Sequence, residues 1–229
     1  MTIGIIGAMD EEVALLIENM TNKKEQTVAN CLFVSGVIAG KDVVLLKSGI
    51  GKVNAAMATT ILHERFNPDY VINTGSAGGF DENLEIGDIV VSSQVVHHDV
   101  DVTAFDYAYG QVPGMPAMFA ADSQLAALAT NAVKSLAISS KEGIIATADT
   151  FMANPGHVKR IKEKFPAMIA AEMEAAAVAQ VCHQYNKPFV VIRALSDIAG
   201  KESTVSFDAF IDTAAKNAAT LIIKMIKEL

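Results

Sequence analysis

The chain has 229 residues and a formal net charge of −8, with 51% apolar and 19% charged residues. A chain of this length can bury a core without disulfide bonds or metals. The chain is acidic and has only three arginines, whereas proteins that bind a nucleic-acid backbone carry clustered lysines and arginines. We therefore do not expect a nucleic-acid partner. The two cysteines, Cys31 and Cys182, lie far apart with no metal-binding spacing, which favours a reducing compartment, so we expect a cytoplasmic protein.

The sequence predicts neither a secretion signal nor a membrane span. No basic residue precedes the first apolar run, and the acidic residues 10–12 follow it at once. The longest uncharged stretch, 107–121, contains two glycines and two prolines. It is also shorter than the roughly 20 apolar residues that a membrane helix needs.

Short β-branched runs alternate with segments of helical period, which is typical of a mostly parallel sheet covered by helices. The predicted elements in chain order are strand Ile3–Ile6, helix Asp10–Met20, strands Leu32–Ile38 and Val43–Lys47, helix Lys52–Phe66, strands Tyr70–Asn73 and Asp88–Val96, helix Ala121–Leu136, strand Gly143–Thr147, helix Pro155–Lys164, strand Met168–Ala171, helix Glu174–Tyr185, strand Phe189–Ala194 and helix Ser206–Leu229. Residues 39–42 predict a hairpin turn, so the sheet is expected to be mixed, with one early antiparallel pair.

The helices are predicted from apolar spacing and from their ends. Val13, Leu16 and Ile17 recur at helical intervals behind an acidic first turn, which suits the positive end of the helix dipole. The last helix carries an apolar stripe with Ser206 as its expected N-cap. Without a repeat or a linker, residues 1–229 are expected to form a single α/β domain, with a central mixed twisted β-sheet flanked by helices.

Acidic residues follow three of the predicted strands, where ligands bind in open α/β sheets. They are Asp10 to Glu12 after the first strand, Glu172 and Glu174 after a later one, and Asp197 after the last. Two glycine-rich loops, 48–52 and 73–79, follow other strands. The pattern predicts a concave site lined by carboxylates and backbone N–H groups.

Each of these residues also has a plainer explanation. Acids in a first helical turn commonly serve the dipole, and glycine loops are often only tight turns. Asp197 and Glu172 are harder to explain in that way, because a carboxylate at the end of an apolar strand needs a partner.

The sequence supports three other kinds of site less well: a dinucleotide site, a metal site and a nucleophilic cysteine. Gly4-Ile5-Ile6-Gly7 lacks the spacing of a dinucleotide fingerprint. The cluster His97, His98, Asp99 and Asp101 has ligand types suited to a divalent ion, but contiguous residues of this kind are more typical of a surface or interface cluster, and we predict no metal site. Cys182 and His183 lie inside a predicted helix, where an activated thiolate is not expected.

Longer motifs cover essentially the whole chain. They are IGIIGAMDEE at 3–12, LLKSGIGKVNAA at 45–56, INTGSAGG at 72–79, GDIVVS at 87–92, HDVDVTAFDYAYGQVPG at 98–114, AEMEAAAVAQVC at 171–182, PFVVIRALSD at 188–197 and SFDAF at 206–210. In these motifs the chain resembles the 5′-methylthioadenosine/S-adenosylhomocysteine nucleosidases, hydrolases of the purine nucleoside phosphorylase superfamily. The resemblance implies a nucleoside phosphorylase-like homodimer without metal or organic cofactor.

The resemblance also implies a reaction, the hydrolysis of the N-glycosidic bond of methylthioadenosine, adenosylhomocysteine and 5′-deoxyadenosine in methionine salvage. Such a bond breaks through an oxocarbenium-like cation, which requires an acid, a base and anchors on the sugar. Asp197 is then the acid that protonates adenine, and Ser196 orients it. Glu12 is the base for water, and Glu174 holds the ribose hydroxyls.

The same resemblance assigns the rest of the pocket. Phe151 is expected to stack on adenine, and the backbone of Met152 to contact its polar edge. The other expected substrate-binding residues are Met9, Ile50, Ser76, Ala77, Gly78, Glu172, Met173 and Phe207. Methionine and phenylalanine at such positions are also common in ordinary cores, which is the alternative for Met9 and Phe207.

The segment 98–119 is long and apolar and contains several aromatic residues, which argues against disorder. The resemblance implies that it crosses a dimer interface, with Val102, Phe105 and Pro113 completing the partner's pocket. Residues 201–205 are a candidate lid.

Two alternatives stay open. A phosphorylase of the same superfamily uses phosphate instead of water, and more than one arginine normally binds phosphate. Here Arg193 is the arginine near a predicted strand end, with Lys47 and Lys52 near a glycine loop, so hydrolysis is favoured. A nucleoside-binding sensor without catalysis predicts that one of Glu12, Glu174 and Asp197 is missing, and all three are present.

Overall fold

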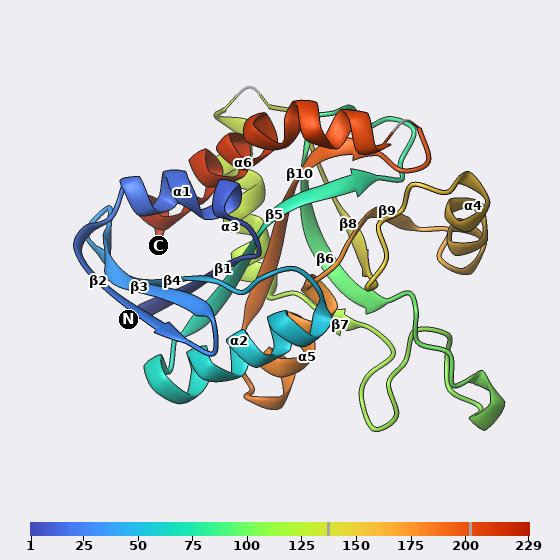
Figure 1. Cartoon of the computed structure of the whole chain (residues 1–229), viewed down its shortest axis with the longest axis horizontal. Helices are drawn as coiled ribbons and strands as arrows, with labels where there is room; N and C mark the ends of the chain where they lie inside the picture. The colour runs from blue at the N-terminus through green and yellow to red at the C-terminus, as the bar shows by residue number, and fades with distance from the viewer. Residues whose placement is uncertain (137, 202) are drawn as a thin grey trace.

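The computed structural model describes residues 1–136, 138–201 and 203–229, in which a mixed sheet has helices on both faces (Figure 1). The elements are β1 (Thr2–Gly7), α1 (Asp10–Glu18), β2 (Thr21–Val28), β3 (Cys31–Ile38), β4 (Lys41–Lys47), α2 (Lys52–Phe66), β5 (Tyr70–Gly79), β6 (Ile89–His97), the 3₁₀ turn Thr103–Phe105, β7 (Phe119–Ala120), α3 (Ser123–Lys134), β8 (Ser140–Thr147), α4 (Pro155–Lys164), β9 (Met168–Glu172), α5 (Ala175–Gln184), β10 (Phe189–Ile198) and α6 (Ser203–Glu228).

Part of the sheet closes on itself. Strand β5 pairs with β10, β10 with β6, β6 with β8, β8 with β9, and β9 returns to β5. From β5 the sheet continues as an open arm in the order β1, β4, β3 and β2. The arm joins β5 along residues 70–73, where β1 pairs, whereas β9 pairs with Gly78 and Gly79. The second halves of β5 and β10, which pair with each other, therefore belong to the closed part.

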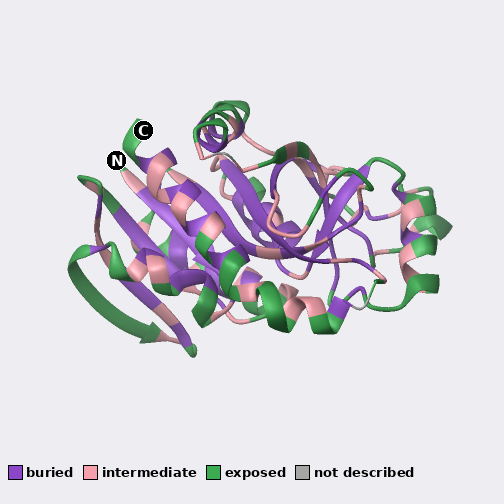
Figure 2. Cartoon of the chain, turned by 90° about the horizontal axis from the view of Figure 1, so that it is seen from above, coloured by how far each residue is buried: buried purple, intermediate pink, exposed green. Residues whose placement is uncertain are grey.

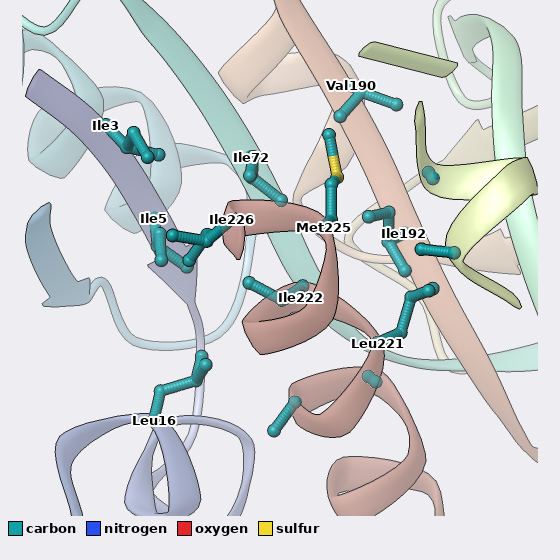
Figure 3. Close-up of a cluster of buried hydrophobic side chains, with 14 of the residues drawn as sticks. Ile3, Ile5, Leu16, Ile72, Val190, Ile192, Leu221, Ile222, Met225 and Ile226 are labelled. Carbon is teal, nitrogen blue, oxygen red and sulfur yellow. The ribbon is translucent and has the colours of Figure 1, made fainter. Parts of the chain in front are cut away.

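Helices α1, α3 and α6 cover one face of the sheet, and α2 and α5 cover the other (Figure 1). The apolar stripe of α6 packs on β1, β5 and β10 through residues such as Leu221, Ile222 and Met225, all fully buried (Figure 3). Most of the strands are buried along most of their length, whereas β2 is exposed (Figure 2). This packing holds the strand ends that carry the acidic residues, and α4 packs on a smaller third cluster.

Strands β5 and β10 are longer than the sequence predicts. The glycine loop expected at 73–79 is the second half of β5, and Asp197 lies inside β10, not after it. The two halves pair in parallel, with an irregularity between Leu195 and Asp197. Glycine and alanine have low strand propensity, but their small size lets two backbones approach closely, and that tertiary contact outweighs propensity.

Other expectations need correction. Strand β2 was not predicted, because its side chains are polar and almost all exposed, so no alternating pattern marks it. The hairpin between β3 and β4 is confirmed, but it is not the one antiparallel pair: β2 with β3, β10 with β6, β5 with β9, and β6 with β7 are also antiparallel.

The last helix begins three residues earlier than expected, at Ser203, so Ser206 lies within it and is not its N-cap. Glu174 precedes α5 as its N-cap and is not in its first turn. Of the candidate lid at 201–205, residues 203–205 are helical, and position 202 lies outside the described residues.

Residues 98–118 form a long excursion that leaves the end of β6 and returns at β7 (Figure 1). Phe105 in this excursion is 75% exposed, although it is a large apolar side chain. In the part of the chain that the structure describes, no helix has the length and hydrophobicity of a membrane span.

Candidate active site

A cavity of about 400 Å³ opens where β1 and β9 end and where the second halves of β5 and β10 meet the start of α6. Its lining combines carboxylates with apolar side chains. The lining residues are Ala8, Met9, Glu12, Ile50, Ser76, Ala77, Gly78, Phe151, Ala171, Glu172, Met173, Glu174, Ser196, Asp197, Thr204, Phe207 and Asp208. Every catalytic and substrate-binding residue expected from the sequence is among them, except Met152.

Met152 is buried beside the cavity and packs in the small core cluster under α4. Its carbonyl accepts a hydrogen bond from the Gly200 N–H at 3.1 Å. The Met152 carbonyl therefore already has a hydrogen-bond donor within the protein.

Glu12 lies in the first turn of α1, and four donors hold its carboxylate. The backbone N–H groups of Ala8 and Met9 donate to Oε2 at 2.8 and 3.2 Å. The backbone N–H and the hydroxyl of Ser76 on β5 donate to Oε1 at 2.9 and 3.2 Å. The carboxylate is thus fixed between β1 and β5, and its role is not limited to the helix dipole.

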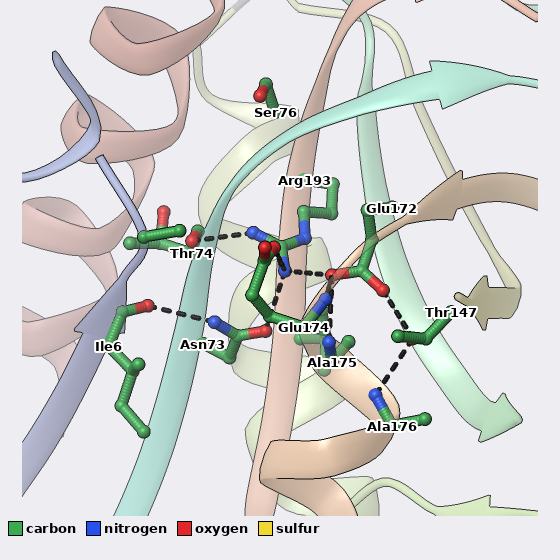
Figure 4. Close-up of polar contacts among 12 residues, drawn as sticks. Ile6, Asn73, Thr74, Ser76, Thr147, Glu172, Glu174, Ala175, Ala176 and Arg193 are labelled. Atoms are coloured by element: carbon green, nitrogen blue, oxygen red, sulfur yellow. Dashed lines mark hydrogen bonds and ion pairs between the residues drawn. The ribbon is translucent and has the colours of Figure 1, made fainter. Parts of the chain in front are cut away.

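Arg193 on β10 is fully buried and lies among the acidic groups of the cavity (Figure 4). Its guanidinium donates to the Thr74 carbonyl at 2.7 Å and to the Asn73 amide oxygen at 2.9 Å. It also forms an ion pair with Glu172 and lies 3.6 Å from a Glu174 oxygen. Carboxylates surround this cation, so it is not available to an anionic ligand.

Glu174 accepts a hydrogen bond from the Gly51 N–H at 2.8 Å, which links α2 to the site. Burial raises the pKa of Glu174, and the negative charge of Glu172 raises it further, while Arg193 acts in the opposite direction. A further positive or hydrogen-bonding partner would therefore stabilise the ionised form of Glu174.

Asp197 is buried, with 2% of its surface exposed. The Ser196 hydroxyl donates to its Oδ1 at 2.9 Å. Burial raises the pKa of the Asp197 carboxyl, and hydrogen bonds from Ser196 and Ser203 act against this shift. A carboxyl that keeps its proton to higher pH can act as a general acid.

The other walls of the cavity are apolar. Phe151 and Phe207 meet edge to face with ring centroids 5.9 Å apart, and Phe151 is 41% exposed. Met9 and Ile50 lie on the wall formed by the ends of β1 and β4. An exposed aromatic ring near a buried carboxyl is suited to a flat heterocycle with a polar edge.

Sequence reasoning missed several lining residues, namely Ala8, Ala171, Thr204 and Asp208. Thr204 lies three positions before Phe207 and four before Asp208, so it shares a helix face with both once the helix is extended to Ser203. The Thr147–Glu172–Arg193 contacts were also missed, because they join strands far apart in the sequence.

The residues expected at a partner's pocket lie in the excursion 98–118. Val102 is partly buried, and Phe105 and Pro113 are exposed. The His97–Asp101 cluster is divided among separate partners: His97 contacts Gln180, Asp99 pairs with Lys52, and Asp101 accepts from Thr103.

The two lysines considered for phosphate form ion pairs with aspartates. Lys47 pairs with Asp10 at 2.7 Å and Lys52 with Asp99 at 2.6 Å. Of the described residues that line the cavity, none is a lysine or an arginine.

Comparison with known proteins shows the family to which the chain belongs. The phosphorylase superfamily model matches residues 2–227. Proteins from Anoxybacillus flavithermus and Oceanobacillus iheyensis, both named 5′-methylthioadenosine/S-adenosylhomocysteine nucleosidase, are 63% and 61% identical. The first comparison covers 100% of this chain and 99% of the relative, and the second covers 100% of both.

A crystal structure of the nucleosidase of the same name from Neisseria meningitidis, in complex with methylthio-immucillin-A, has a TM-score of 0.98 and 47% identity. That comparison covers 100% of this chain and 99% of the other. The chain therefore belongs to the 5′-methylthioadenosine/S-adenosylhomocysteine nucleosidase family of the phosphorylase superfamily.

Proposed function

We propose that this protein hydrolyses the N-glycosidic bond of 5′-methylthioadenosine and S-adenosylhomocysteine, and also of 5′-deoxyadenosine, releasing adenine and the 5′-substituted ribose. The observation that carries the proposal is the composition of the cavity. It combines a buried carboxyl of raised pKa, a fixed carboxylate and an apolar wall, with no cation among its described lining residues.

Each group has a place in the reaction. Adenine lies on Phe151, and the Asp197 carboxyl donates its proton to the leaving base, which departs as a neutral molecule. The Glu12 carboxylate takes a proton from the attacking water, and Glu174 binds the ribose hydroxyls. Negative charge around the sugar stabilises the positive charge that develops there as the bond breaks.

Water is the nucleophile because the site does not suit phosphate. A phosphate dianion would lie among Glu12, Glu172 and Glu174, and the guanidinium of Arg193 is already paired with Glu172. Buried like charges repel each other strongly, so the phosphorylase alternative is not favoured.

The 5′-substituent points to the apolar wall of Met9, Ile50 and Phe207. We further propose that two chains form a homodimer, in which Val102, Phe105 and Pro113 of one chain complete this wall in the other. The 75% exposure of Phe105 supports the proposal, because its ring is accessible to pack against a partner chain. The free, buried cysteines Cys31 and Cys182 suit a cytoplasmic location.

The deciding experiment incubates the purified protein with methylthioadenosine in phosphate-free buffer made with ¹⁸O-labelled water. We expect adenine and methylthioribose carrying one ¹⁸O at the anomeric carbon, identified by mass spectrometry. A parallel reaction with added phosphate should proceed at the same rate. A requirement for phosphate, or a ribose 1-phosphate product, would contradict the proposal.

A further inference from the structure

Glu172 lines the cavity, but the protein itself uses its hydrogen-bonding capacity (Figure 4). Its Oε2 accepts from the Arg193 guanidinium and from the backbone N–H groups of Glu174 and Ala175, the latter two at 3.0 and 2.8 Å. Its Oε1 accepts from the Thr147 hydroxyl. With four donors on two oxygens, this carboxylate has little capacity left for a ligand.

Glu174 is in the opposite situation. The described donor to its carboxylate is the Gly51 N–H at 2.8 Å, and the Arg193 nitrogen lies 3.6 Å from the other oxygen, beyond hydrogen-bond range. Glu174 therefore keeps lone pairs for the two ribose hydroxyls. The two glutamates are two positions apart in the chain. The hydrogen-bonding capacity of Glu172 is saturated, whereas Glu174 keeps capacity for a ligand.

We propose that Glu172 is a positioning residue: it holds Arg193 away from Glu174 and fixes the start of α5, so that the Glu174 carboxylate stays available to the ribose. This inference rests on the proposed function and changes Glu172 from an expected substrate-binding residue to a residue that supports Glu174. Thr147 supports the same arrangement, because its hydroxyl donates to Glu172 and accepts from the Ala176 N–H at 2.9 Å.

The charges explain why the support matters. Three carboxylates, Glu12 on α1, Glu172 on β9 and Glu174 before α5, face the single guanidinium of Arg193 on β10. Without the charge of Glu172, Arg193 would turn its attraction to Glu174 and compete with the ribose hydroxyls. The same change would lower the pKa of Glu174, because Glu172 is one of the groups that raise it.

The test uses Glu172→Gln, which keeps the shape and removes the charge, and Thr147→Val, which removes the hydroxyl. For both variants we expect kcat/KM for methylthioadenosine to fall by about 10- to 100-fold, mostly through KM, as when supporting residues of other sites are removed. The acidic limb of the pH profile should move to lower pH in Glu172→Gln. Thr147→Ser retains the hydroxyl and should match the unmodified protein.

Binding measurements separate this proposal from the proposed function. The probes are adenine and a 5′-methylthio C-nucleoside, whose C–C glycosidic bond cannot be hydrolysed. In Glu172→Gln the affinity for the C-nucleoside should fall by about tenfold or more while the affinity for adenine stays within about threefold. This holds even if the unmodified protein fails to hydrolyse methylthioadenosine, a result that would refute only the proposed function.

Two results would overturn the positioning role. One is an unchanged KM and an unchanged acidic limb in Glu172→Gln. The other is an equal loss of adenine and C-nucleoside binding, which would indicate a general structural defect. If Glu172→Gln does not fold, Thr147→Val and Thr147→Ser decide the question by the same measurements.

Discussion

Burial raises the pKa of two carboxyl groups of the cavity, and in the proposed reaction each shift bears on a different step. The raised pKa of Asp197 favours its protonated form, which a proton donor to a leaving base requires. The raised pKa of Glu174 also favours the protonated form, but its proposed role toward the ribose requires a carboxylate. The same physical cause therefore supports one role and opposes the other, and Arg193 compensates at Glu174.

Replacing the acid tests its role directly. Asp197→Asn keeps the size of the side chain but has no proton to transfer, so kcat should fall by at least about 100-fold. Adenine release from methylthioadenosine measures the loss, and circular dichroism checks the fold. Asp212→Asn, an exposed aspartate on α6, is the matched control and should retain full activity. Turnover within about tenfold of normal in Asp197→Asn would refute the assignment.

The pH dependence of kcat/KM follows from the two shifts. Glu174 must be ionised, and its raised pKa means that activity is lost on acidification already above pH 4.3, the approximate pKa of an ordinary glutamate. Asp197 must be protonated, and its raised pKa extends activity upward before it falls with rising pH. We expect a bell-shaped profile whose basic limb disappears in Asp197→Asn. A profile that rises steadily to high pH would contradict these roles.

At the scale of the elements, strands with a clear apolar pattern were predicted within a few residues, among them β3, β6 and β9. Most residues that line the cavity could be named from the sequence, because they lie in recognisable motifs.

The contacts between these residues could not be predicted. The Arg193–Glu172 ion pair, for example, depends on how β9 and β10 are placed across the closed part of the sheet.

Strand β5 offers an element-scale prediction at Gly75, whose φ is +153°. A Cβ here would overlap the Arg193 guanidinium and lie 2.6 Å from Glu12 Oε1. We expect Gly75→Ala to destabilise the fold by roughly 2–5 kcal/mol and to abolish activity. Urea unfolding measures the first effect and adenine release the second.

The control for this variant is Gly40→Ala, in the turn between β3 and β4. Gly40 also has a positive φ, +82°, but an added Cβ would meet nothing within 4 Å. This substitution should lower the free energy of unfolding only through backbone strain, by about 1–3 kcal/mol, with little effect on catalysis. Equal behaviour of the two variants would show that the crowding at β5 is unimportant.

At the scale of the whole molecule, apolar surface is distributed unevenly. Phe105 and Val53 are 75% and 78% exposed, although the chain buries most of its other large apolar residues. Covering such side chains on association is favourable at about 25 cal/mol per Å² of apolar surface. The proposed dimer would bury Phe105 and link activity to protein concentration.

The proposed dimer predicts a loss of specific activity on dilution, because dimers then dissociate into single chains whose sites are incomplete. Phe105→Ala should dissociate at higher concentration and show a raised KM for methylthioadenosine. Phe210→Ala removes an exposed phenylalanine outside the excursion and serves as the control. Analytical ultracentrifugation and kinetics at matched concentrations measure both effects. A fully active monomer with an unchanged KM would refute the proposed interface.

Strand β2 forms the outer margin of the open arm, and its side chains are hydrated along almost the whole strand. Lys23 and Lys24 lie where its register with β3 is irregular. Charged side chains and irregular pairing discourage a further strand from docking. Concentrated solutions of the protein should therefore resist fibril growth from this outer strand, as thioflavin T fluorescence over time can measure.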